Sequence, residues 1–149
     1  MIGETNSYDG NGLYRYITKP ITLEAGFDAG DLRVYYTAYR PLNTNVFVYY
    51  KILSREDKQP FSDSDWQLMT TISGSSTYSK DKEDFIEFVA APGINGVADN
   101  SVFYTSKEND KVYNKFYQFA IKIVITSTDK TIVPFLKDMR GIALLPIGV

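Results

Sequence analysis

One loop of this 149-residue chain concentrates oxygen ligands of the kind that bind calcium. Five such side chains lie between positions 57 and 65: Asp57, Ser62, Asp63, Ser64 and Asp65. Calcium takes about six to eight oxygen ligands, and carboxylates in a flexible loop can supply them. The glycine and the terminal glutamate of an EF-hand loop are missing. Because a solvated turn whose Asp side chains bond their own backbone explains the same residues, we predict no metal site.

A cluster of acids, Glu83, Asp84 and Glu87, raises the question of acid–base chemistry. Glycosidases need two carboxyl groups facing each other across a cleft. On an extended strand Glu83 and Glu87 share one face with Phe85, but one strand face is not a cleft. The sequence has no His and no Cys, so it lacks the commonest general base and the thiolate nucleophile. We expect no catalytic residues, no cofactor and no enzymatic activity.

Two predicted strands in the first half of the chain position a third set of candidates, which are aromatic. DLRVYYTAY (31–39) alternates apolar with polar or aromatic residues, and VFVYYKIL (46–53) repeats the pattern. Period-two alternation is typical of a strand with one buried face. Pro41, Asn43 and Asn45 favour a tight turn between the two strands, so we predict a β-hairpin. Four aromatic side chains would share its outer face: Tyr35, Tyr39, Phe47 and Tyr49.

Three interpretations of these aromatic residues remain open. They could form a protein–protein interface, where tyrosine and tryptophan are enriched. Together with Tyr14 and Trp66 they could form a platform on which carbohydrate rings stack. They could also be ordinary packing between two sheets. We predict Tyr35, Tyr39, Phe47 and Tyr49 as a candidate interface for self-association, because exposed apolar patches mark partner surfaces.

The elements around these residues are predicted to be almost entirely strands. The alternation recurs over residues 13–23, 66–72, 85–90, 101–105, 113–126 and 140–145, and a helical turn is possible only at PFLKDM (134–139). Aromatic content of 15% also favours sheets. We predict an all-β, antiparallel, jelly-roll-like β-sandwich of about seven to nine strands. Residues 1–12 are expected to form a flexible N-terminal arm and residues 13–149 a single domain, with Val48, Phe119, Ile121 and Ile123 in its core.

Composition excludes several classes of partner. The formal net charge is −2 and no basic cluster is present, so nucleic acid is not expected as a partner. The apolar runs are too short to span a membrane, and the first residues lack a signal-peptide pattern. The absence of cysteine excludes disulfides. We therefore expect synthesis in the cytoplasm and cohesion through buried area and strand pairing.

Three blocks of the sequence resemble a domain of tailed-bacteriophage structural proteins, particularly tail and baseplate-associated proteins of marine phages. The blocks are YITKPITLEAGFDAGDLRVYYTAYRPLNTNVFVYYKIL, DSDWQLM and FYQFAIKIVITSTDKTIVPFLKDMRGIALLP, at residues 16–53, 63–69 and 116–146, and the similar elements span residues 14–146 in the same order. The resemblance implies a virion component that assembles with copies of itself and other virion proteins, and it brings no active site. The alternative is a receptor- or glycan-binding module for a host-surface glycan, with loops 54–65 and 73–84 as its binding surface.

Overall fold

The computed structural model of the chain describes residues 5–6, 10–73, 78–81, 83–99, 101–128 and 134–144. Side chains are described from residue 15 onward, except at position 73. Within the described residues the protein is almost entirely β, with 55% strand and 3% helix. Among the described residues the helical part is a three-residue 3₁₀ turn, η1 (Phe61–Asp63). The prediction of an all-β protein is confirmed.

Two antiparallel sheets form the body of the protein. The β5 sheet has the order β1-β2-β13-β5-β6, with β3 also paired to β13. Its strands are β1 (Thr5–Asn6), β2 (Gly10–Ile17), β3 (Ile21–Thr22), β5 (Thr44–Leu53), β6 (Gln67–Leu68) and β13 (Gln118–Ser127). The β4 sheet has the order β14-β4-β8-β7. Its strands are β4 (Asp31–Tyr39), β7 (Thr70–Ser73), β8 (Ile86–Ala91) and β14 (Phe135–Leu144).

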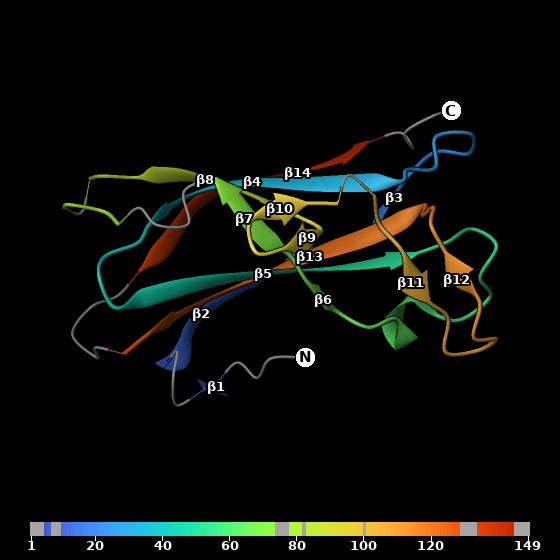
Figure 1. Cartoon of the computed structure of the whole chain (residues 1–149), viewed down its shortest axis with the longest axis horizontal. Helices are drawn as coiled ribbons and strands as arrows, with labels where there is room; N and C mark the ends of the chain where they lie inside the picture. The colour runs from blue at the N-terminus through green and yellow to red at the C-terminus, as the bar shows by residue number, and fades with distance from the viewer. Residues whose placement is uncertain are drawn as a thin grey trace.

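The two sheets lie one above the other, as expected for a sandwich (Figure 1). Two small hairpins complete the described strands: β9 (Gly93–Ile94) with β10 (Val97–Ala98), and β11 (Tyr104–Thr105) with β12 (Val112–Tyr113). There are more strands than the predicted seven to nine, because many of them are only two residues long. β2 begins at Gly10, inside the range predicted as an arm, whereas residues 1–4 and 7–9 lie outside the described part.

The core lies between the two sheets and is built from the inward faces of their long strands. The predicted core residues are all buried there: Val48, Phe119, Ile121 and Ile123. From the opposite sheet, Tyr36 stacks on Phe88 with ring centroids 5.0 Å apart. The alternation along β4, β5 and β13 therefore predicted correctly which side chains point inward, because this periodicity is a local property of the backbone.

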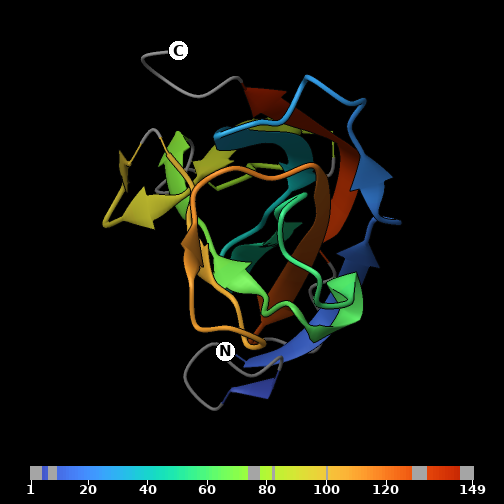
Figure 2. The same cartoon turned by 90° about the vertical axis from the view of Figure 1, so that its right-hand side faces the viewer.

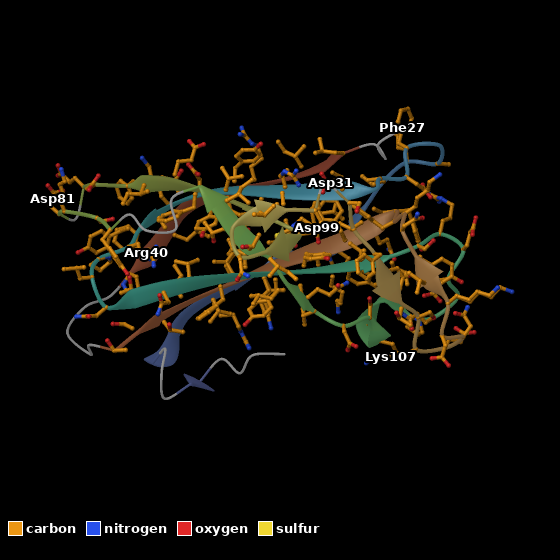
Figure 3. The ribbon with its side chains drawn as sticks, in the orientation of Figure 1. Phe27, Asp31, Arg40, Asp81, Asp99 and Lys107 are labelled. Carbon is orange, nitrogen blue, oxygen red and sulfur yellow. The ribbon has the colours of Figure 1, made fainter. Side chains whose placement is uncertain are left out.

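The predicted β4–β5 hairpin is wrong. β4 pairs with β14 and β8, whereas β5 pairs with β13 and β6, so the two strands belong to different sheets. The turn between them crosses from one layer to the other, and Arg40 lies at that crossing (Figure 3). The Arg40 guanidinium donates through Nε to the Thr44 carbonyl at 3.4 Å. Alternation defines the buried face of a strand but not its neighbour, so two strands with one apolar face each can also pack across a core.

Two further predictions about elements are wrong in detail. The strand predicted over 66–72 divides into β6 and β7, which belong to different sheets on either side of Met69. The helical turn considered at 134–139 is instead the start of β14. A β-bulge between Leu136 and Asp138 adds one residue, so that Leu136 and Met139 both pack against the core. This spacing of three imitates the period of a helix.

Candidate functional site

The four aromatic residues predicted as an interface do not share one surface. Tyr35 and Tyr39 lie on the outer face of the β4 sheet, and Phe47 and Tyr49 lie on the outer face of the β5 sheet. Tyr49 is only 2% exposed, whereas the other three are partly exposed. The predicted patch rested on the hairpin, and the separation of β4 and β5 into two sheets divides it.

The outer face of the β5 sheet is covered around Tyr49. Lys122 as a residue is only 3% exposed. Its Nζ atom lies 4.8 Å from the ring centroid of Tyr49 and 5.1 Å from the ring centroid of Trp66. The Nζ atom of Lys51 lies 4.9 Å from the ring centroid of Trp66 and 4.8 Å from that of Phe61. Burial, together with the charge of Lys122, lowers the pKa of the Lys51 amine. These cation–π contacts tie the loop containing η1 to the sheet.

The loop predicted as a possible calcium site is held inside the fold. The Asp57 carboxylate is buried and accepts hydrogen bonds from the Tyr104 hydroxyl at 2.8 Å and the Ser106 hydroxyl at 3.1 Å. The Ser64 hydroxyl donates to the Ile52 carbonyl at 2.7 Å. Burial raises the pKa of the Tyr104 hydroxyl, and its bond to Asp57 adds to this effect. Asp57 also accepts a hydrogen bond from the backbone N–H of Gln59 at 3.2 Å, as in the turn considered above, but its carboxylate is buried and holds the loop to β11.

Three of the other oxygen-bearing side chains of that loop face solvent and not Asp57. Ser62, Asp63 and Asp65 are exposed, and Asp65 forms an ion pair with Lys107 at 2.7 Å. Within the described ranges, no group of three or more acidic side chains is arranged to hold a metal ion.

The acidic cluster at 83–87 does not form the arrangement considered for catalysis. β8 begins at Ile86, so Glu83 and Asp84 precede the strand and only Glu87 lies on it. Asp84 accepts a hydrogen bond from the backbone N–H of Lys80 at 2.8 Å, which closes a turn. Glu87 is exposed on the outer face of the β4 sheet. The expectation that Glu83 and Glu87 share a strand face is therefore wrong.

The most exposed large apolar side chains of the described residues lie on a hairpin between the two predicted strands 85–90 and 101–105. Ile94 and Val97 are 72% and 69% exposed, and they face each other across the β9–β10 hairpin. The two residues between them, Asn95 and Gly96, have φ values of 54° and 82°, as in a type I′ turn. Asn-Gly between two β-branched residues is the sequence signal that was missed.

The backbone around this hairpin is fixed by two interactions. A Cβ atom at Gly93 would lie 2.0 Å from the Val97 carbonyl oxygen, so only glycine fits at that position. The N–H of Gly96 donates to the Thr70 hydroxyl at 2.7 Å, which anchors the turn to β7. The hairpin therefore presents Ile94 and Val97 from a constrained backbone.

Other exposed apolar residues lie on the same side of the sandwich. β6 and β7 carry Leu68 and Ile72, and the Gln67 amide donates to the Phe103 carbonyl at 3.2 Å. The β9–β10 hairpin stands in front of the sheets in Figure 1 and projects to the left in Figure 2. We call the surface formed by Ile94 and Val97 the hairpin patch.

A second open surface is the outer face of the β4 sheet. Tyr39 and Phe135 lie with ring centroids 5.3 Å apart, and Phe85 meets Phe135 edge-on at 5.6 Å. Two outward rows further along, the Arg140 guanidinium lies 5.2 Å from the Tyr35 ring centroid. This face combines aromatic and charged side chains, in contrast to the apolar hairpin patch.

Comparisons with protein families, with curated proteins and with solved structures find no match. No helix in the described part of the chain is long and apolar enough to cross a membrane.

Proposed function

We propose that this protein is a non-enzymatic assembly module of a tailed-phage virion, working in the tail, baseplate or fibre. In this proposal the sandwich is a rigid body that binds a second copy of itself, and then other virion proteins. Two observations support it: the hairpin patch, and the resemblance of the three sequence blocks to phage tail and baseplate-associated domains. The proposed place of action is the virion, after synthesis in the host cytoplasm.

The hairpin patch is the observation that carries the proposal. Ile94 and Val97 are 72% and 69% exposed and lie opposite each other on the hairpin. Together they expose an area on the order of the few hundred Å² that mark interaction sites. Burying a side chain such as Ile94 against a partner contributes roughly 1.5–3 kcal/mol. Because the hairpin backbone is already constrained, little conformational entropy is lost on binding.

A second copy of the chain is the first partner we propose. Four hollows on the described surface are each lined by charged side chains, so none of these four is an apolar socket for Ile94 or Val97. Two hairpin patches facing each other about a two-fold axis form a self-complementary contact. Ile94 and Val97 alone would bury less than the roughly 1,200 Å² of a small stable interface, so a weak, reversible dimer is expected.

Sedimentation velocity tests this dimer. We expect the wild-type protein to dimerise reversibly at tens of micromolar, and the double variant Ile94→Ser, Val97→Ser to be monomeric with an unchanged melting temperature. Leu42→Ser is the matched control, because Leu42 is 63% exposed but lies in the β4–β5 turn. Equal dimerisation of the double variant, or a wild type that stays monomeric, would contradict the proposal.

The virion part of the proposal has its own test. Tail genes of phages cluster, so the open reading frames on either side of this one should encode tail or baseplate proteins. Flanking genes for unrelated metabolic enzymes would count against a role in the virion.

A further inference from the structure

We propose that the outer face of the β4 sheet binds a neutral saccharide, in a hollow of about 300 Å³. The side chains that line it and carry the argument come from three adjacent strands: Tyr35, Thr37, Glu87, Asp138 and Arg140. This site is separate from the hairpin patch and does not depend on the assembly function. It would let one domain both assemble and recognise a surface glycan.

Strand register builds the hollow. Thr37 on the central strand β4 is paired with Glu87 of β8 on one side and with Asp138 of β14 on the other. Two carboxylates therefore flank one hydroxyl. Tyr35, the next outward residue along β4, is paired with Arg140. The bulge before Asp138 sets this register, because it shifts the alternation of β14 by one residue.

Apart from the contact of Arg140 with the Tyr35 ring, the five outward side chains of this hollow have no hydrogen-bond or ion-pair partner among the described residues. Arg140 forms no ion pair there, although Asp138 lies two residues away on the same strand and Glu87 lines the same hollow. Tyr35, Thr37, Glu87 and Asp138 likewise make no side-chain hydrogen bond to the described part of the chain.

Two comparable groups elsewhere in the molecule are paired. Arg55 binds Asp28 through two nitrogens, at 2.9 and 3.1 Å, and covers the Tyr117 ring. The buried Asp57 is bonded to Tyr104 and Ser106. Strand register thus brings two carboxylates, a guanidinium, a hydroxyl and a tyrosine ring together around one hollow. A ligand that can use several donors and acceptors at once would fill it.

The chemistry of the lining favours a sugar over other ligands. Carboxylates accept hydrogen bonds from hydroxyl groups, and a guanidinium donates to hydroxyl or ring oxygens. The Tyr35 ring supplies an apolar surface beside these groups. Two carboxylates disfavour an anionic ligand, and the polar rim disfavours an apolar one. The volume lies at the small end of ligand sites, near about 300 Å³, which suits one pyranose ring.

The neighbouring aromatic cluster extends this face along the strands. Tyr39 follows Thr37 on the outward side of β4, and its ring contacts Phe135, which in turn meets Phe85. The Lys137 amine lies 4.7 Å from the Phe85 ring centroid. A second sugar unit bonded to the first could lie against this cluster, so we expect oligosaccharides to bind more tightly than monosaccharides.

Amide chemical-shift mapping on the full chain tests the proposal. The probes are glucose, galactose, mannose and N-acetylglucosamine at millimolar concentration, and short neutral oligomers of each. We expect at least one to shift amides of β4, β8 and β14 selectively. Asp138→Asn and Arg140→Ala should each weaken binding by about tenfold, the loss of one charge-assisted hydrogen bond. Asp81→Asn, an exposed acid outside the hollow, is the matched control.

Three results would overturn the proposal. The first is the absence of selective shifts with every probe. The second is binding that Asp138→Asn and Arg140→Ala leave unchanged. The third is binding abolished by a chelator, because a metal ion rather than the side chains would then hold the sugar. The Ile94→Ser, Val97→Ser variant should bind saccharide normally, so failure of the dimer and failure of this site can be told apart.

Discussion

At the scale of single residues, Asp57 shows a potential cation ligand used to hold the fold together. Its carboxylate accepts bonds from Tyr104 and Ser106, and the Tyr104 hydroxyl in turn accepts one from the N–H of Ser54 at 2.8 Å. The chain therefore joins its 54–64 loop to β11 through buried polar contacts. Residue type alone could not distinguish this role from metal binding, since both use the same oxygen atoms.

We predict that Asp57→Ala lowers the free energy of unfolding by about 3 kcal/mol, because two buried hydroxyl donors lose their acceptor. Asp63→Ala, at an exposed position of the same loop, should change it by less than about 0.5 kcal/mol. Urea unfolding followed by tryptophan fluorescence measures both. Equal, small effects would show that the buried contacts of Asp57 add nothing to stability.

Buried tyrosines predict the behaviour of the protein at high pH. Burial raises the pKa of both Tyr36 and Tyr50 to about 12. Below pH 10 both hydroxyl groups are protonated in the folded and unfolded states, so the free energy of unfolding does not change with pH on their account. Above pH 10 only the unfolded state loses the protons, so stability should fall by about 1.4 kcal/mol per pH unit for each group until about pH 12. Urea midpoints between pH 9 and 12 measure this, and Tyr36→Phe should reduce the slope.

At the scale of elements, alternation predicted faces well and partners poorly. The inward positions of Val48, Ile121 and Ile123 follow from a period of two, which is set within each strand. The partner of a strand depends on contacts far along the chain, and so β4 and β5 were wrongly paired with each other. A bulge after Leu136 added one residue and made β14 resemble a helical turn.

The same limit applied to the candidate sites. Tyr49 is buried because Lys122 and Trp66, both distant in sequence, cover it. No local pattern around Tyr49 could indicate this. The β9–β10 hairpin, in contrast, was predictable from Asn95-Gly96 alone, since that pair favours the two positive φ angles of a type I′ turn.

The packing between the two sheets makes a quantitative prediction. Ile123 is fully buried on β13, whereas Ile17 on β2 is 47% exposed. Ile123→Ala should cost about 2–5 kcal/mol of stability, from lost burial and the cavity left behind, and Ile17→Ala should cost much less. Thermal unfolding of both variants measures the difference. Equal melting temperatures would show that the face of β13 has been assigned wrongly.

At the scale of the whole molecule, the two sheets differ in what they leave open. The outer face of the β5 sheet is covered around Tyr49 and Lys122. The hairpin patch is apolar and projects from one side (Figure 2), whereas the outer face of the β4 sheet is aromatic and charged. A domain that assembles and also recognises a ligand needs two such surfaces of different chemistry. We therefore expect self-association and saccharide binding to be independent.

Disulfide trapping tests the central claim, self-association through the hairpin patch, most directly. The chain has no cysteine. A single introduced cysteine can therefore form a protein disulfide only with the same residue of another molecule. We predict that Ile94→Cys or Val97→Cys forms a covalent dimer rapidly under mild oxidation at micromolar concentration, whereas the equally exposed Leu42→Cys does so only slowly. Equal rates of crosslinking at all three positions would indicate random collision and contradict assembly through this patch.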